Sequence, residues 1–552
     1  MQHASDAFPS HWVVLLDVGL SVLALVAAAA APRWLAAPDR RFWPALRRWA
    51  RHPATAFGLV FALGVLGNGM IFLLQGPPVP WVTDEHAYLL AADTFAHGRL
   101  ANPSSPFWRH FDVPSHILHW PVYAAKYPPA QGLFLALGQV LAGSPAFALC
   151  LGAGLLPALA WWALRGWLPP SWALYGGLTV LLRLGAGSYW NQSYWGGTVA
   201  AMGGALVYGA LPRLLRRPAL ASGLLFALGL AVLANSRPYE GLLASLPALA
   251  AVGWAARRSA DGRALRRVLA APAVFLGLVA LGMGYYNQRL TGDPLCLPHR
   301  AYSVAYNTPP EFVFLDDRGT PFGHQLRPPT CDAPRLLADP ASWFRRSIAA
   351  AGDRAARGLF FFLGTGLTLA LFTLAGRGGR RPGGAGRSRH GAGALGWTLV
   401  AACALVAAGE SVTRVWFAHY PSPVVVPLLA LALLGGRRLR AWRWRGRPAG
   451  RSLPLLILSI QLLLFVFQLP AHRPDDGHWS VQRASFQAFL EARGGKHLVI
   501  VRPGGDWIAN RADLDRAAVV WARDLGEERN RELLRHFADR EVWWLDLRRA
   551  VR

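Results

Sequence analysis

Acidic and basic side chains stand close to apolar runs in this chain, in an order that could support a group transfer. Asp84 and Glu85 are adjacent in "WVTDEHAYLLAADTFAHGRL", residues 81–100. Lys126, one of only two lysines, stands in "AAKYPPAQG". A carboxylate can accept a proton from a hydroxyl group, and a lysine can neutralise a departing phosphate. The acidic pair could also serve only as a helix cap, because Thr83 precedes it and acidic residues favour the first turn.

Polar residues recur in other short segments between apolar runs. Arg237 and Glu240 stand in "NSRPYEG", residues 235–241, and His419 and Tyr420 stand in "VWFAHYPSPVV", residues 415–425. Arginine suits phosphate binding, so we expect Arg237, with His419 and Tyr420, to join Lys126 at a donor phosphate. Arg237 and Glu240 could instead simply pair at the interface and hold the turn. The polar residues expected to bind substrate are Tyr88, Tyr127, Asn191, Gln192, Tyr239 and Glu240.

The composition places these residues in a membrane protein. The 552 residues are 53% hydrophobic and only 16% charged, with a mean hydropathy of +0.26. These values exclude a single soluble domain. The net charge of +27 comes largely from arginine clusters between apolar runs, which favours membrane orientation over nucleic-acid binding. We therefore predict an all-α polytopic bundle with about 11–12 transmembrane helices.

The arginine clusters predict which loops face the outside. Loops rich in arginine tend to be cytoplasmic, so the acidic pair and the C-terminal tail lie on the other side. The apolar segment at 130–143 would invert every later cluster if it crossed, and we expect it to lie along the membrane. Residues 76–144 and 287–355 then form long external loops. The second loop contains Cys296 and Cys331, which could form a disulfide in an oxidising compartment.

The tail from residue 472 has a different composition. A helix at 480–493 precedes the short apolar runs "KHLVIVR", "AAVVWAR" and "EVWWLDL", and a helical segment separates the last two runs. Alternating strands and helices predict a small extracytoplasmic α/β domain. Its tryptophans could contact sugars, but aromatic residues in short strands more often belong to a core. The residues concerned are Trp507, Trp521 and Trp543.

The order of these motifs resembles the C-type fold glycosyltransferases, in particular the branch with protein O-mannosyltransferases and the lipid A aminoarabinose transferase. The matching pieces are "TDEHAY", "KYPPAQGLFLALG", "NQSYWGG", "SRPYEGL" and "HYPSPVVVPLLAL". The resemblance covers residues 55–471. Residues 1–54 add an N-terminal transmembrane helix with a basic loop, and residues 472–552 form the tail domain.

The resemblance implies a sugar transfer from a polyprenyl-phosphate donor to an extracytoplasmic glycan, lipid or protein acceptor, with inversion. It implies Asp84 as general base, Glu85 as its assistant, and Lys126 and Arg237 as phosphate contacts. Some members of the fold use a divalent cation such as Mg²⁺ or Mn²⁺ and others do not. The histidines of the first external loop match no closed zinc site; they are His86, His97, His110, His116 and His119.

Two other functions compete with this hypothesis. A transporter of lipid or small anions would need charges within the spans and broken helices in two halves, whereas here we expect the charges at the external ends. A scaffold of an envelope polysaccharide assembly complex would explain the tail but leave Asp84, Lys126 and Arg237 without a task. The composition is typical of a GC-rich bacterium, so the expected location is the inner membrane, with the site facing the periplasm.

Overall fold

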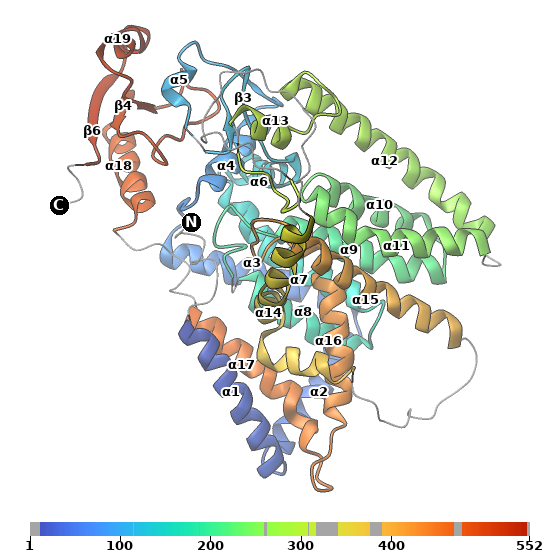
Figure 1. Ribbon diagram of the computed structural model, residues 1–552. Helices are drawn as coiled ribbons and strands as arrows, with labels where there is room; N and C mark the ends of the chain where they lie inside the picture. Colours follow the sequence, from blue (N-terminus) through green and yellow to red (C-terminus); the bar gives the residue numbers. More distant parts are fainter. Residues whose placement is uncertain are drawn as a thin grey trace.

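The computed structural model describes residues 11–113, 115–186, 188–258, 262–306, 308–315, 340–375, 389–468 and 477–548. These residues form a large helical bundle with a smaller α/β unit at one end (Figure 1). The bundle helices are α1 (His11–Ala30), α3 (Pro53–Gln75), α7 (Ala146–Leu164), α8 (Pro170–Val180) with the π-helix η2 (Leu181–Gly185), α9 (Thr198–Arg216), α10 (Leu220–Ala234), α11 (Pro238–Arg258), α12 (Gly262–Thr291), α14 (Pro340–Phe372), α15 (Arg389–Ser411), α16 (Val425–Arg440) and α17 (Leu453–Gln468).

Among the described residues, eight helices are long and apolar enough to cross a membrane. The chain is therefore a multi-pass membrane protein, as predicted. Each apolar run predicted to span overlaps one of the bundle helices. The remaining predicted spans correspond to α8 with η2, α10, α11 and α15, which are shorter, interrupted or more polar than the other eight.

Two of the arginine clusters meet at one end of the bundle. Helix α2 (Ala36–Ala50) carries Asp39, which is buried. Its Oδ2 lies 3.1 Å from Nη2 of Arg440 and 3.0 Å from Nε of Arg451. Figure 1 shows α2 and the end of α16 at the opposite end of the molecule from the C-terminal strands. The two clusters thus share one side of the bundle, as their predicted common orientation requires.

The first external loop folds into short elements packed on the bundle. They are α4 (Thr83–Ala96), β1 (Asn102–Pro103), α5 (Trp108–Phe111), β2 (Ile117–Leu118), β3 (Val122–Ala125) and α6 (Pro129–Ala142). Strand β3 pairs antiparallel with both β1 and β2. Helix α6 has only 14 residues, too few for an ordinary crossing. A Cβ at Gly132 would lie 2.7 Å from Cβ of Ala91, so glycine lets α6 approach α4 closely.

The N-terminus of α4 is capped by Glu85 and not by Thr83. The helix begins at Thr83, and its N-cap residue is Val82. Oε1 of Glu85 accepts hydrogen bonds from the backbone N–H groups of Trp81, at 2.9 Å, and Val82, at 3.3 Å. The predicted Thr83 cap was wrong because the helix starts one residue earlier than a Thr83 cap requires. Glu85 therefore caps the helix, and the Asp84 carboxylate remains available for contacts with other groups.

Charged side chains also occur within the bundle, which corrects the expectation that charges sit only at external ends. Helix α14 is interrupted at Gly364, which has φ +66°. Nε of Arg183, in η2, donates to the carbonyl of Phe361 at 3.1 Å. Asp17, on α1, accepts a hydrogen bond from the backbone N–H of Thr365 at 2.8 Å. Backbone groups freed by the interruption are thus satisfied by side chains, as the interior of a bilayer requires.

The tail folds as predicted into a small α/β unit. It contains α18 (Trp479–Arg493), β4 (His497–Arg502), β5 (Val519–Arg523), α19 (Glu527–His536) and β6 (Glu541–Asp546). The strands are parallel and ordered β5-β4-β6. Trp507 and Trp521 belong to its hydrophobic core and the partly buried Trp543 packs against that core, which supports a packing role over sugar contact.

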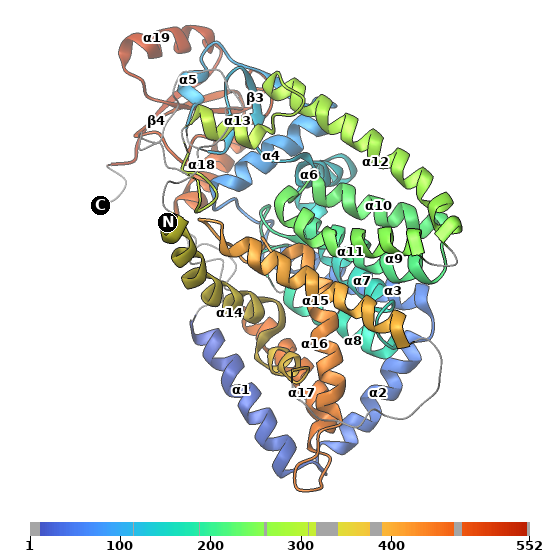
Figure 2. The same ribbon diagram turned by 45° about the vertical axis from the view of Figure 1, so that its right-hand side comes forward.

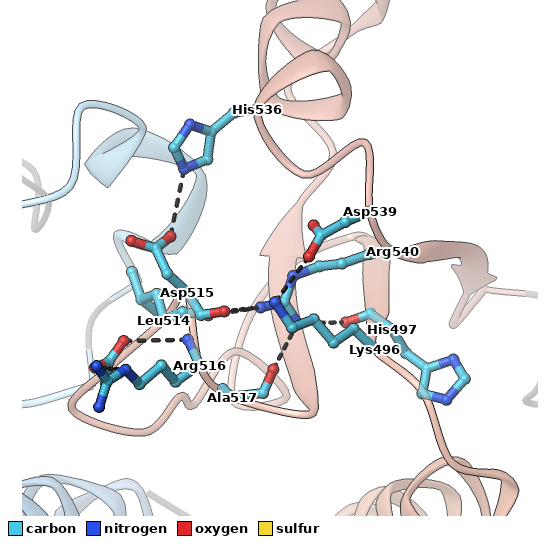
Figure 3. A network of polar contacts seen from close by, with 10 residues as sticks. Lys496, His497, Leu514, Asp515, Arg516, Ala517, His536, Asp539 and Arg540 are labelled. Carbon is cyan, nitrogen blue, oxygen red and sulfur yellow. Dashed lines mark hydrogen bonds and ion pairs between the residues drawn. The ribbon is translucent and has the colours of Figure 1, made fainter.

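Arg540 connects the segments of this α/β unit (Figure 3). Its Nη1 donates to the carbonyl of Ala517 at 2.6 Å, and its Nη2 donates to the carbonyls of Leu514, at 2.9 Å, and Asp515, at 2.8 Å. The buried guanidinium thus provides hydrogen-bond donors for the backbone carbonyls of the loop that leads into β5. On the surface Lys496 pairs with Asp539 at 2.7 Å.

The α/β unit packs directly on the first external loop. Nη1 of Arg523 donates to the carbonyl of Asp112 at 2.6 Å, and the backbone N–H of Ala512 donates to Oδ2 of Asp93 at 2.8 Å. Figure 2 shows β4 and α19 beside α5, β3 and α13 (Pro298–Ala305). The tail and the acidic pair therefore lie on the same side of the bundle.

The cysteines differ in state. Cys296 is disulfide-bonded, whereas Cys150 and Cys403 are free. The expected partner, Cys331, lies outside the described residues, as does most of the basic segment from Arg377 to Arg389.

Candidate active site

Asp84 lies in the first turn of α4 with each carboxylate oxygen near a different side chain. The Tyr127 hydroxyl donates a hydrogen bond to Oδ1, and Nε2 of His116 lies 3.4 Å from Oδ2. Burial opposes ionisation of Asp84, but His116 and Tyr127, together with the charge of Lys126, outweigh burial and hold its pKa below the usual value. The side chain keeps 25% of its surface exposed. Asp84 is therefore an ionised carboxylate that a ligand can reach.

Lys126 directly follows β3 and is 7% exposed. Its Nζ lies 4.8 Å from the ring centroid of Tyr302 and 5.3 Å from that of Tyr127. Burial lowers the pKa of Lys126 to about 8, although the charges of Asp84 and Glu311 act in the opposite direction. A cation held between aromatic faces, with little access to water, can attract an anionic ligand group strongly.

His116 contributes to the site through an unusual backbone conformation. Its φ is +63°, which is uncommon for a residue other than glycine. The backbone N–H of Lys126 donates to the His116 carbonyl at 3.1 Å, and the N–H of His116 donates to the Tyr302 hydroxyl at 3.3 Å. This role could not be predicted from the sequence, in which His116 is one of several histidines in the loop. Its relation to Asp84 depends on how the β2–β3 hairpin folds.

Arg237 approaches the site from the turn between α10 and α11. Its Cζ lies 4.4 Å from the ring centroid of Tyr420. Burial opposes the charge of Arg237, but neighbouring Glu240 and Tyr88 outweigh burial and raise its pKa above the usual value. The charge of Asp84 also acts on Tyr420. The structure therefore brings Arg237, Tyr420, Tyr88 and Glu240 into the electrostatic surroundings of Asp84, as the hypothesis requires.

His419 belongs to the same region but does not supply a positive charge. It is completely buried, and its Nδ1 lies 2.8 Å from the Tyr189 hydroxyl. Burial lowers its pKa well below the usual value, and the nearby charge of Arg237 lowers it further. The contact of His419 with a donor phosphate stays a prediction, and a neutral imidazole would offer that phosphate only a hydrogen bond.

The predicted substrate tyrosines divide into two groups. The Tyr88 ring stacks on that of Tyr127, with centroids 4.5 Å apart, so both line the surroundings of Asp84. The Tyr239 hydroxyl donates to the carbonyl of Gly409 at 3.1 Å, and its ring contacts that of Phe312. This arrangement gives Tyr239 a packing role between α11 and the end of α15.

Glu85 points away from the Asp84 carboxylate and into the protein. It is completely buried, and its Oε2 accepts a hydrogen bond from the backbone N–H of Tyr194 at 2.7 Å. Burial raises the pKa of Glu85 to about 8, even though three backbone N–H groups act against this shift. Glu85 therefore joins α4 to the segment that contains Tyr194, which is a positioning role.

Asn191 and Gln192 make hydrogen bonds within the bundle. The side-chain amide of Asn191 donates to the carbonyls of Leu184, at 3.0 Å, and Gly185, at 2.8 Å. These carbonyls belong to the π-helix η2, where the regular helical pattern is interrupted. The Gln192 side chain donates to Asn68 of α3. These contacts give both residues structural tasks, and their contact with substrate stays a prediction.

A contact between His299 and Glu311 in the second external loop was not predicted from the sequence. Nδ1 of His299 lies 2.6 Å from Oε1 of Glu311. Burial and the charge of Lys126 lower the pKa of His299, although Glu311 opposes them. The backbone N–H of Arg414 donates to the Glu311 carbonyl at 2.7 Å, which attaches this loop to the segment after α15. Nothing in the spacing of these residues indicated that they would meet beside Lys126.

The described residues contain no group of three or more histidine, cysteine, aspartate or glutamate side chains that could hold a metal ion. Mg²⁺ is often held by one or two carboxylates together with substrate phosphate oxygens, so a divalent cation at this site stays a prediction. The cationic side chains in the surroundings of Asp84 are Lys126 and Arg237.

Comparison with known proteins identifies the fold of this chain. The sequence matches no protein-family model and no curated protein. The structure resembles ArnT from Cupriavidus metallidurans bound to undecaprenyl phosphate, with 13% identity, a TM-score of 0.50, and coverage of 90% of this chain and 89% of that one. Weaker similarities are to apo ArnT from the same organism (12% identity, TM-score 0.49, coverage of 89% and 90%) and to the Archaeoglobus fulgidus oligosaccharyltransferase (10% identity, TM-score 0.40, coverage of 84% and 63%). The chain has the C-type glycosyltransferase fold that its motifs predicted.

Proposed function

We propose that this protein is a membrane glycosyltransferase that moves a sugar from a polyprenyl-phosphate donor to an acceptor outside the cytoplasm. The observation that carries the proposal is the ionised Asp84 beside the buried Lys126, in a loop packed on an apolar bundle. The fold supports it, because the similar ArnT structure contains undecaprenyl phosphate.

In the proposed reaction the acceptor hydroxyl lies against the Asp84 carboxylate. A new bond forms between the acceptor oxygen and the anomeric carbon, while the bond from that carbon to the donor phosphate oxygen breaks. The low pKa makes Asp84 a weak base, so it first orients the hydroxyl and takes the proton only as the new bond acidifies that group. The proton then reaches water through the Asp84–His116 pair, whose side chains keep 25% and 27% of their surface exposed.

The leaving polyprenyl phosphate retains the electron pair of the broken bond. Lys126 and Arg237 neutralise the negative charge that develops on its oxygen. Both cations lie near aromatic rings, Lys126 at Tyr302 and Arg237 at Tyr420, which excludes water and strengthens the attraction.

The arrangement of the carboxylates supports inversion at the anomeric carbon. Retention by double displacement needs a second carboxylate that can attack the sugar. The adjacent candidate, Glu85, is completely buried and bound to backbone N–H groups. A single displacement with Asp84 as the base therefore fits the site best.

The proposed location is the inner membrane of a bacterium with the site facing the periplasm. The support is the arginine distribution: Arg440 and Arg451 meet Asp39 at one end of the bundle, and the α/β unit lies at the other end. Arginine-rich ends face the cytoplasm in most membrane proteins.

The experiment is a transfer assay with the purified full-length protein in nanodiscs. The donor is a radiolabelled polyprenyl-phosphate sugar, and the acceptor is an extract of bacterial envelope lipids and glycans. We expect label in the acceptor fraction, with a linkage opposite in configuration to the donor. Release of labelled sugar only to water, or transfer with the same configuration, would contradict the proposal.

A further inference from the structure

A cavity lies behind α4, on the side away from Asp84. It has a volume of about 280 Å³, is partly open to the outside, and is bordered by α4, the end of α6 and the α/β unit. Its lining includes His86 and Asp93 of α4, Gln139 of α6, and Arg483 and Arg511 of the α/β unit. Positions 84 and 88 share one side of a helix, whereas 86, 90 and 93 share another. The cavity is therefore distinct from the proposed active site.

His86 gives an independent sign of a ligand. The side chain is 8% exposed, and its Nε2 is buried with no hydrogen-bond partner among the described residues. A buried polar atom normally has a partner, because leaving it unmatched is unfavourable. Because His86 lines the cavity, a small shift of its ring would let a ligand there supply the partner that Nε2 lacks.

The charges around the cavity favour an anion. Arg483 uses Nε and Nη2 to bind the carbonyls of Trp507, at 2.8 Å, and Ala509, at 2.6 Å, so its positive charge is fixed at the wall. The Arg511 side chain is 70% exposed, and its Nη2 lies 3.9 Å from a carboxylate oxygen of Glu491.

The acidic residue of the lining, Asp93, already has neutral partners. Its Oδ1 accepts a hydrogen bond from Gln139 at 3.0 Å, and its Oδ2 accepts one from the backbone N–H of Ala512 at 2.8 Å. The groups left for a ligand are therefore mainly donors: the Arg511 guanidinium and the imidazole of His86. An oxygen-rich anionic group matches this surplus of donors.

The position of α6 suggests access from the membrane. Leu133, Leu137, Val140 and Leu141 are between 45% and 66% exposed, so one side of α6 is apolar and uncovered within the chain. Gln139, on the same helix, lines the cavity. An amphiphile could thus place its tail along α6 and its headgroup in the cavity.

We propose that this cavity binds one phosphate-type anionic group, carried by a lipid headgroup or by soluble phosphate. The cavity is too small for more than such a group with a sugar-sized neighbour. The site is additional to the proposed transfer reaction and does not depend on it.

The test measures binding by the purified full-length protein. One arm titrates inorganic phosphate in neutral detergent, and the other transfers the protein into nanodiscs with either phosphatidylglycerol or only phosphatidylcholine. The variants are Arg511→Gln and His86→Leu. The control is Arg516→Gln, which removes the same charge from an arginine that is 91% exposed and does not line the cavity.

We expect the wild type and Arg516→Gln to bind the anion equally, and the two cavity variants to bind at least about tenfold more weakly. Binding of inorganic phosphate in detergent would identify a soluble anion as the ligand. Binding found only in the phosphatidylglycerol nanodiscs would identify a lipid headgroup as the ligand. His86→Leu should keep the thermal stability of the wild type, because it removes an unmatched polar atom. Absence of binding in both arms, or equal binding by all variants, would overturn the proposal.

Discussion

Nε2 of His116 lies 3.4 Å from Oδ2 of Asp84. The Tyr127 hydroxyl donates a hydrogen bond to the other carboxylate oxygen, Oδ1, so contacts on two sides fix the direction of the Asp84 side chain. His116 reaches this position through its positive φ, which the hairpin around it maintains.

Replacing His116 should disturb the reaction more than the fold. We expect His116→Asn, which tolerates the left-handed conformation, to lower kcat by about tenfold to a hundredfold, because Asp84 loses one orienting partner. The KM for donor should change less than kcat. His119→Asn is a matched control on the same hairpin. A variant with full kcat would show that His116 does not position Asp84.

Donor binding should depend on the protonation of Lys126. Burial lowers its pKa to about 8, so the side chain is cationic below that pH and neutral above it. The KM for the donor should therefore rise as pH increases through about 8. In Lys126→Met the KM should be at least about tenfold higher at pH 7, without that rise. An unchanged pH profile in Lys126→Met would assign the dependence to another group.

Much of this site could be predicted from the sequence. A polar loop that follows an apolar run lies at the end of the corresponding helix, so the sequence indicates at which end of the bundle the loop residues lie. This reasoning placed Asp84, Lys126 and Arg237 on one side, and the structure brings them into one region. The strands of the tail could also be predicted, since "KHLVIVR" and "EVWWLDL" have strand composition, and the structure shows that they pair in parallel.

Other features could not be predicted because they depend on tertiary contacts. Asn191 and Gln192 look like exposed binding residues in the sequence, yet they satisfy backbone and side-chain groups at the η2 interruption. The complete burial of His419 and the nearby charge of Arg237 lower its pKa well below the usual value, and neither could be seen in the sequence.

Glu85 should contribute to stability. Glu85→Ala would leave the buried N–H groups of Trp81, Val82 and Tyr194 without their acceptor, and we expect a loss of about 2–4 kcal/mol in the free energy of unfolding. Thermal unfolding in detergent measures the loss. Glu527→Ala is the matched control, since Glu527 also lies in a first helical turn but is 92% exposed. Equal melting temperatures for the two variants would contradict this role.

The pH dependence of stability follows from the same residue. The pKa of Glu85 is raised in the folded state to about 8, so folding is favoured by its protonated form. Its contribution is complete below the unfolded pKa and is lost as pH rises through about 8. The wild type should therefore lose stability over this range more steeply than Glu85→Gln, as measured by melting temperature against pH. Parallel curves would show that another group titrates.

Asp17 should fasten α1 to the interrupted helix α14. Asp17→Leu removes the acceptor for the Thr365 N–H and the negative charge near the buried Arg183, and it should lower stability by about 2–3 kcal/mol. Asp17→Asn keeps an acceptor oxygen and should lose less. Thermal unfolding in detergent distinguishes the two. A Leu variant as stable as the wild type would mean that this contact does not hold α1 in place.

The most direct test of the central claim is the single-turnover transfer rate of Asp84→Asn with a radiolabelled polyprenyl-phosphate sugar. Asp353→Asn, an exposed change of the same kind, serves as the control. We predict that Asp84→Asn still binds the donor but transfers sugar at least about a hundredfold more slowly, while the control retains the wild-type rate. Transfer by Asp84→Asn at the wild-type rate would contradict the account.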